Sequence, residues 1–193
     1  MTTYMIQTTA TQLRLSAPYN PDFIGPAKTN LGAKWDGECW CFDIRDKDAA
    51  LKFIEARYGW QMGMPLVSVN VKFNEDRHYG RGPCILLGRV IAAAKDRDCG
   101  VTLGNGVRLL NGVATSGGSA KNWTTEIRAD SEFVVHDVPM QMAQDYITGN
   151  RKSRNVVVTL VEPLVPVVVD KTSLEDERTA LMQRLSEIDT QLA

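Results

Sequence analysis

Residues that commonly carry catalysis are few in this chain, and they do not recur at the spacing of a catalytic set. The only two histidines, His78 and His136, stand far apart in the sequence. Neither lies at the spacing of a metal site or of a triad with a nucleophile. We therefore expect both to be solvated or hydrogen-bonded structural side chains, and we predict that the protein has no catalytic residues and is not an enzyme.

The spacing of the four cysteines is more typical of free thiols than of metal ligands. Cys39 and Cys41 are expected to share one strand face, but their C-x-C spacing has only the remote Cys84 and Cys99 to complete it. Zinc sites usually contain C-x-x-C pairs, so we predict no metal and no cofactor. Because the chain shows no charged-then-apolar leader and no transmembrane run, we expect a reducing, cytoplasmic location and no membrane partner.

A glycine-rich stretch, Gly112–Ser119, approaches the spacing of a phosphate-binding loop. Gly118 stands where such a loop requires a lysine, and no strand-then-helix pattern surrounds it. One interpretation is a flexible hairpin loop. The alternative is that the amides of residues 117–119, with Lys121 and Trp123 beside them, make an anion and base-stacking contact.

Basic side chains are the better candidates for binding. Trp35, Trp40 and Phe42 could stack on bases, but aromatic residues at strand spacing beside an amphipathic helix are more often core residues. We therefore expect a nucleic acid or a partner protein to contact mainly basic residues. The predicted binding residues are Lys34, Arg77, Arg81, Lys121, Trp123, Arg151, Lys152 and Arg154.

The elements that would position these side chains begin with the stretch from Tyr19 to Gly59. Asn20, Pro21 and Asp22 are typical of a helix start. Pro26 lies deep in that helix, where proline removes a hydrogen bond. The helix is therefore expected either to be kinked there or to begin at Pro26.

The dipeptide Asp36-Gly37 predicts a tight hairpin. A two-residue loop pairs Trp35 with Glu38 and Lys34 with Cys39. Strand alternation then places Trp35, Trp40 and Phe42 on one face, and Lys34, Cys39 and Cys41 on the other. A second helix, opened by Asp46 and Asp48 and ended at Gly59, is expected to cover the aromatic face.

This order of features resembles the HARP-type domain, which occurs beside the motor of annealing helicases and in stand-alone proteins. The resemblance covers about a fifth of the chain and rests on Tyr19 to Ile24, Lys34 to Asp36, Trp40 to Phe42, Leu51, and Phe53-Ile54. It implies binding of single-stranded or branched DNA without catalysis by the module. Pro26 departs from the uninterrupted first helix of the family, and no helicase motor accompanies the module here.

We expect an α+β fold with three parts: a HARP-like module over 1–62, an antiparallel β-rich domain over 65–169, and an amphipathic helix over 172–193. The middle domain is expected to be barrel-like or a sandwich, because short strands and turns alternate there. We expect residues 74–82 to form a polar loop and Cys84–Ala92 a single strand with a bulge at Gly88. Residues 139–146 are expected to form a short helix.

The last residues predict an amphipathic, coiled-coil-like helix. Its apolar side chains are Leu181, Leu185, Ile188 and Leu192. This seam could dock within the chain or pair with another copy, and we expect the latter, which makes the protein a homo-oligomer. The apolar segments 156–160 and 164–169 also need a cover, which a partner subunit could supply.

Two functional classes remain for a chain with 44% hydrophobic residues and a net charge of −1. Even charge along the chain argues against extensive wrapping of duplex, so any nucleic-acid surface must be local. The first class is a non-enzymatic accessory protein that binds single-stranded or junction DNA. The second is a phage-type anti-defence inhibitor or adaptor that binds a bacterial nucleic-acid-targeting protein complex.

Overall fold

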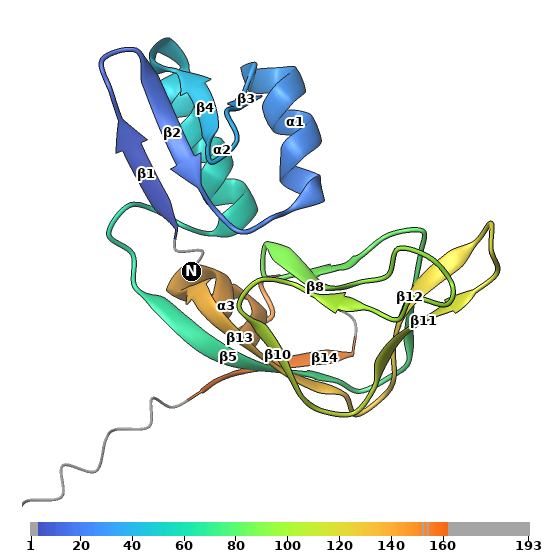
Figure 1. Ribbon diagram of the computed structural model, residues 1–193. Coiled ribbons are helices and arrows are strands. Elements are labelled where there is room, and N and C mark those ends of the chain that lie inside the picture. Colours follow the sequence, from blue (N-terminus) through green and yellow to red (C-terminus); the bar gives the residue numbers. More distant parts are fainter. Residues whose placement is uncertain (1–3, 152, 154, 162–193) are drawn as a thin grey trace, which may run out of the picture. The chain divides into compact units, whose positions relative to one another are not determined.

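The computed structural model describes residues 4–151, 153 and 155–161. Within these residues the fold is mixed α+β, with three α-helices and antiparallel strands arranged in four sheets (Figure 1). This confirms the predicted α+β class. The predictions for Lys152, Arg154, the segment 164–169 and the helix carrying Leu181, Leu185, Ile188 and Leu192 lie outside the described residues.

The first sheet belongs to the N-terminal module. Its strands run in the order β1 (Met5–Thr8), β2 (Gln12–Ser16), β4 (Trp40–Asp43) and β3 (Lys34–Trp35). Strand β2 pairs with β4 of the hairpin, and all three ladders are antiparallel. Strand β1 was not predicted, because its short run has no clear alternation of polar and apolar residues.

The hairpin pairs differently from the prediction. Trp35 lies opposite Trp40 and Lys34 opposite Cys41, so the loop is four residues long and not two. The Asp36 carboxylate closes this loop by accepting hydrogen bonds from the amides of Glu38 (2.9 Å) and Cys39 (2.7 Å). The predicted register was therefore wrong by two residues. Since side chains alternate with a period of two, Trp35 and Trp40 still share one face.

Helix α1 (Pro21–Leu31) starts at its first proline and continues through Pro26, so the alternative start at Pro26 is wrong. The Asn20 side chain accepts a hydrogen bond from the Asp22 amide (3.0 Å), which satisfies one of the free donors at the helix start. Gly32 ends the helix in the left-handed conformation, at φ 59°.

Helix α2 (Lys47–Tyr58) follows a 3₁₀ turn (Ile44–Asp46) and ends at Gly59, as expected. The side chains of α1, α2 and the sheet share one apolar cluster centred on Phe23. The rings in contact with Phe23 are Trp40, Phe42, Phe53 and Tyr58. Trp40 and Phe42 are thus core residues, as the sequence predicted.

The largest sheet of the β-rich part has the order β10 (Val107–Asn111), β13 (Glu132–Pro139), β5 (Leu66–Phe73) and β14 (Val156–Leu160). Helix α3 (Met140–Ile147) follows β13 and buries Met142 and Ala143. Strand β5 alternates buried and half-buried residues along its second half, so one face carries the core residues Val69, Val71 and Phe73.

Two smaller sheets complete this part. One has the order β11 (Ala114–Gly118), β12 (Trp123–Ile127), β6 (Arg77–Gly80). The other has the order β7 (Cys84–Leu86), β8 (Arg89–Ala93), β9 (Thr102–Leu103). The described strands form four open sheets and no closed barrel.

Three local predictions for this part were wrong. The polar loop over 74–82 contains strand β6, and the glycine-rich stretch over 112–119 contains β11. The single strand over Cys84–Ala92 is a hairpin, because Leu87 and Gly88 adopt positive φ values of 54° and 71° and turn the chain back. Both residues match a tight primed turn, which requires positive φ at two successive positions.

The two parts have separate apolar clusters but are joined by direct contacts. The Val90 amide donates to the Tyr19 carbonyl (3.4 Å), and the Arg89 guanidinium lies 5.8 Å from the centre of the Tyr4 ring. Tyr4 in turn stacks on Trp60 with 5.3 Å between ring centres. The described chain up to Val161 therefore forms one compact unit.

Candidate functional site

The N-terminal module contains a cleft of about 480 Å³ between the end of β2, helix α1 and the β3–β4 hairpin. Its lining residues are Ala17, Pro18, Tyr19, Asn20, Ile24, Lys28, Trp35 and Trp40. We call it the aromatic cleft, because three of these side chains are aromatic. Its size is that of ordinary small-ligand pockets.

The two tryptophans of the aromatic cleft differ in exposure. They are cross-strand neighbours with ring centres 5.4 Å apart and ring planes inclined by 54°. Trp40 is only 9% exposed, whereas Trp35 is 52% exposed. A half-exposed aromatic ring loses part of the stabilisation that burial of its apolar surface would give. The Trp35 ring lines the aromatic cleft, where a planar ligand could stack on it.

Lys28 supplies the charge of the aromatic cleft. Its Nζ lies 5.6 Å from the centre of the Trp40 ring, within the range of a cation–π interaction. Lys28 follows Ile24 by one helical turn, so both reach the cleft from the same face of α1. Of the described residues in the lining, Lys28 alone carries a charge, so the charge of the aromatic cleft is positive.

The backbone that carries Tyr19 is held on both sides. The buried Tyr58 hydroxyl donates to the Pro18 carbonyl (3.1 Å), and burial raises the pKa of Tyr58 well above its ordinary value. Asn20 is buried as the cap of α1. The Tyr19 ring itself is 65% exposed. Because this backbone is already fixed, stacking of a ligand on the exposed ring costs no further backbone entropy.

A polar cluster fixes the hairpin that presents Trp35. The Asp36 carboxylate accepts from the Arg14 guanidinium and lies 3.4 Å from the Cys41 Sγ. The amides of Cys39 and Glu38, then the Cys41 thiol and Arg14, hold the pKa of Asp36 well below its usual range. Burial, and then Asp36, raise the pKa of the Cys41 thiol. Cys41 is therefore a protonated structural donor and not a nucleophile.

Four of the predicted binding residues lie on or beside the small sheet β11–β12–β6. Arg77 pairs with Ile127 at one end of the β6–β12 ladder. At the other end the Arg81 amide donates to the Trp123 carbonyl (2.9 Å), and exposed Lys121 lies in the β11–β12 turn. The sheet thus brings Arg81, Lys121 and Trp123 to one end, while Arg77 lies at the opposite end.

The other two described binding candidates lie elsewhere. Lys34 is exposed on β3, and strand alternation places it on the face opposite Trp35. The Arg151 guanidinium donates to the Ala56 carbonyl (2.7 Å) and lies 3.5 Å from the Asp145 carboxylate. Arg151 therefore joins the end of α3 to α2, which gives it a structural role.

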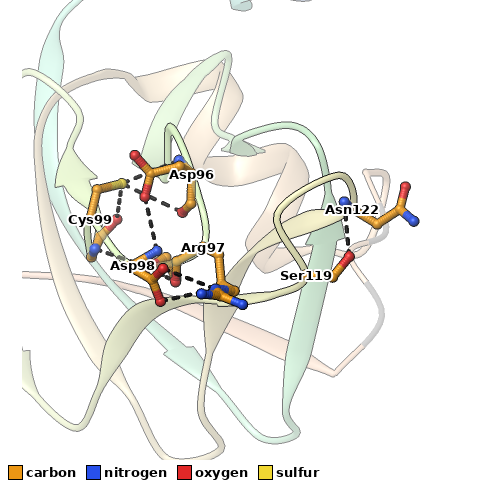
Figure 2. A network of polar contacts seen from close by, with 8 residues as sticks. Asp96, Arg97, Asp98, Cys99, Ser119 and Asn122 are labelled. Atoms are coloured by element: carbon orange, nitrogen blue, oxygen red, sulfur yellow. Dashed lines mark hydrogen bonds and ion pairs between the residues drawn. The ribbon is translucent and has the colours of Figure 1, made fainter.

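The glycine-rich stretch is an ordered hairpin arm. Ser119 and Asn122 exchange backbone hydrogen bonds of 3.1 Å, and the Ser119 hydroxyl also accepts from the Asn122 amide (3.2 Å, Figure 2). A Cβ added at Gly117 would lie 2.2 Å from a Glu126 carboxylate oxygen. Because the Ser119 amide is occupied and a carboxylate covers Gly117, the stretch does not present a row of free amides to an anion.

The neighbouring loop, between β8 and β9, is folded around a thiol (Figure 2). The amides of Lys95 and Asp96 both lie 3.3 Å from the Cys99 Sγ, and the Asp98 amide donates to the Asp96 carboxylate (2.9 Å). Ser116 on β11 fixes the position of this loop, because its hydroxyl donates a hydrogen bond to the Arg97 carbonyl (2.8 Å). These contacts account for the loop conformation without a ligand.

The two histidines have protein partners. His78 lies 3.4 Å from the Glu126 carboxylate, and the His136 Nδ1 lies 2.9 Å from the Ser68 hydroxyl. In the described residues no hydrogen bond joins His136 to a carboxylate, so Ser68 and His136 lack the orienting acid of a triad. All four cysteines are free thiols, and the described part of the chain holds no cluster of three potential metal ligands.

Comparison with protein-family models, curated proteins and solved structures finds no match in any of the three. The resemblance to a HARP-type domain therefore stays a prediction. Among the helices of the described chain, none has the length and apolar character needed to cross a membrane.

The sequence did not reveal Tyr19, Lys28 and the exposed side of Trp35 as parts of one cleft. A helical spacing signal was available for Lys28, which follows Ile24 at i+4. No local signal separates Trp35 from Trp40, because both belong to the aromatic face of the same hairpin. Their difference arises from α1, which covers Trp40 through Phe23.

Proposed function

We propose that this protein binds single-stranded or branched DNA without catalysing a reaction on it, and that the aromatic cleft receives unstacked bases. The observation that carries the proposal is the half-exposed Trp35 ring beside Trp40, with the Lys28 ammonium over the second ring. Bases stack on aromatic rings at roughly 1–3 kcal/mol each, and a cation nearby attracts the phosphate.

The geometry favours single strands over duplex. Base faces are accessible only where bases are unstacked, and base edges in the major groove are read by hydrogen bonds and not by rings. The described lining of the aromatic cleft offers three rings and one ammonium. A forked or gapped substrate supplies the same unpaired bases.

The charge distribution predicts a modest dependence on salt. The chain has a net charge of −1, and Lys28 is the single charge in the described part of the lining. Each phosphate contact on a single strand contributes about −0.7 to the slope of log K against log salt concentration. One or two contacts therefore give a shallow slope of about −0.7 to −1.4.

The proposal is tested by fluorescence anisotropy with a labelled oligothymidylate, a duplex and a fork. We expect the single strand and the fork to bind more tightly than the duplex. Trp35→Ala should weaken binding roughly five- to 150-fold, the equivalent of one stacked base, while Trp35→Phe retains most of the affinity. The absence of any salt-sensitive shift with the unaltered protein would reject the proposal.

A second candidate is an adaptor that binds a nucleic-acid-handling protein complex. The observation that favours it is the exposure of apolar residues at both edges of the β10–β13–β5–β14 sheet: Leu110 and Val113 on or beside β10, and Val157 and Leu160 on β14. An exposed edge strand can pair with a strand of another protein. In this case the sandwich-like β-rich part is the interaction surface, and capture of a defined partner should survive nuclease treatment.

A further inference from the structure

A second pocket of about 180 Å³ adjoins the aromatic cleft. The two cavities share Pro18 and Tyr19 in their linings. The remaining walls of the second pocket come from β8, β9 and the loop after β9, so they belong to the β-rich part of the chain. We call it the Thr102 pocket, after an exposed residue of its lining.

Tyr19 separates the two cavities. Its carbonyl accepts from the Val90 amide, and the neighbouring Pro18 carbonyl accepts from the Tyr58 hydroxyl. The backbone is therefore attached to both parts of the protein, while the ring stays 65% exposed. Tyr19 is thus a lining residue of both cavities, on a backbone that is held in place.

Both cavities carry positive charge. Among the described residues, the only charged one lining the aromatic cleft is Lys28, and the only one lining the Thr102 pocket is Arg89. Arg89 is 2% exposed, and its guanidinium donates to the carbonyls of His136 (2.8 Å) and Asp137. Among the described residues no carboxylate forms a salt bridge with it. Arg89 therefore contributes a buried positive charge to the wall of the Thr102 pocket.

The loop that lines the Thr102 pocket lies directly on this buried cation. A Cβ added at Gly106 would lie 3.2 Å from the Arg89 Nη1, and one added at Gly104 would lie 1.8 Å from the Val90 carbonyl oxygen. Thr102 and Asn105 are exposed beside the pocket, and their side chains carry hydrogen-bond donors. Uncharged donors of this kind commonly contact phosphate.

We propose that the two cavities are adjacent subsites for consecutive nucleotides of a single strand. A base stacks in the aromatic cleft against Trp35, the following phosphate lies in the Thr102 pocket, and Tyr19 stands between the two nucleotides. Thr102 and Asn105 donate hydrogen bonds to this phosphate. Arg89 is a positioning residue, whose positive charge attracts the phosphate without touching it. This inference rests on the proposed function and adds that the β-rich part supplies half of the site.

The test is a charge series at Thr102, which is exposed and so can be changed without disturbing the core. Thr102→Lys, Thr102→Gln and Thr102→Glu are compared for affinity toward labelled hexathymidylate. The matched control is the same series at Thr8, which is exposed on β1 and lines neither cavity. Thermal melting of each variant confirms that it is folded.

We expect Thr102→Lys to bind hexathymidylate more tightly than Thr102→Gln does. Thr102→Glu should bind it at least about tenfold more weakly than Thr102→Gln. The same substitutions at Thr8 should change the affinity far less. The slope of log K against log salt should steepen by about 0.7 in Thr102→Lys, because one more phosphate is neutralised. Competition with unlabelled thymidine nucleotides compares the affinities of the mononucleotide and the dinucleotide. The affinity of the dinucleotide should be roughly five- to 150-fold higher, and Tyr19→Ala should reduce this ratio.

The outcomes separate the two proposals. If Trp35→Ala abolishes binding but the charge series at Thr102 and at Thr8 change the affinity equally, the second subsite is overturned. The proposed function still stands in that case. Absence of binding by the unaltered protein overturns both.

Discussion

Trp35 and Trp40 lie opposite each other on β3 and β4, with ring centres 5.4 Å apart, yet one is half exposed and the other is buried. Trp40 makes an edge contact with Phe23 of α1. Trp35 lies on the two-residue strand β3, which is the edge of its sheet among the described strands. The same residue type on the same face thus serves packing at one position and remains available for a ligand at the other.

This contrast predicts different effects on stability. Trp40→Ala removes a buried ring and should lower the free energy of unfolding by about 3–5 kcal/mol. Trp35→Ala removes a half-exposed ring and should cost about 1 kcal/mol or less. Urea denaturation followed by circular dichroism measures both. Equal losses at the two positions would contradict the assignment of Trp35 to a binding surface.

The sequence predicted the two helices and the hairpin of the N-terminal module, but neither strand β1 nor the pairing of the hairpin. Asp36-Gly37 indicates a turn, and the alternation of Trp35, Trp40 and Phe42 gives the correct faces. The loop length depends on two amide hydrogen bonds to Asp36 and on the reach of Arg14 from β2. A contact between residues so far apart in the chain leaves no local signature.

The cleft was not predictable for the same reason. The sequence placed Trp35 in the core, since a half-exposed and a buried tryptophan have the same strand pattern. Tyr19 lines both cavities, and its carbonyl accepts from Val90 in the other part of the protein, a contact that no local pattern reveals. Strands β6 and β11 were missed because their polar and glycine-rich sequences lack the apolar alternation of a half-buried strand.

The loop that carries Trp35 should respond to pH through Asp36. Its pKa in the folded protein lies well below the ordinary value, so the ionised form contributes stability above the unfolded pKa of about 4. That contribution is lost as the pH falls through the folded pKa. We therefore expect Asp36→Asn to be less stable than the unaltered protein at pH 7, and the difference to shrink steadily below pH 4. A difference that stays constant from pH 7 to the acid limit would contradict this role.

Gly104 should be irreplaceable for a steric reason. An added Cβ would lie 1.8 Å from the Val90 carbonyl oxygen, so the backbone of β8 or of the loop would have to move. Gly104→Ala should cost about 1–3 kcal/mol, the typical range for overpacking, or more. Gly100 is the control, since it has positive φ but open space around its Cβ position. Gly100→Ala should cost only about 1 kcal/mol of backbone strain. Thermal unfolding by calorimetry compares the two.

Arg89 should hold the two parts of the described chain together. It is buried, donates to carbonyls on β13, and lies over the Tyr4 ring of the N-terminal module. Arg89→Met keeps the apolar stem but leaves these buried carbonyls without donors, at about 1–3 kcal/mol for each unsatisfied group. We expect a loss of about 3 kcal/mol or more in chemical denaturation. Arg108→Met on the exposed side of β10 is the matched control and should change stability by less than about 0.5 kcal/mol.

The four thiols should differ sharply in reactivity. Cys99 is exposed, Cys39 and Cys84 are buried, and burial raises the pKa of Cys84 to about 11. Cys41 is half-buried, and its pKa is raised by burial and by Asp36. Since only the exposed thiolate reacts, titration of the native protein with an aromatic disulfide reagent at pH 8 should show one fast thiol and three slow ones. The fast phase should vanish in Cys99→Ser, and all four should react quickly in denaturant. Two fast thiols in the native protein would show that the Asp36 loop opens and exposes Cys41, which would weaken the case for a fixed Trp35.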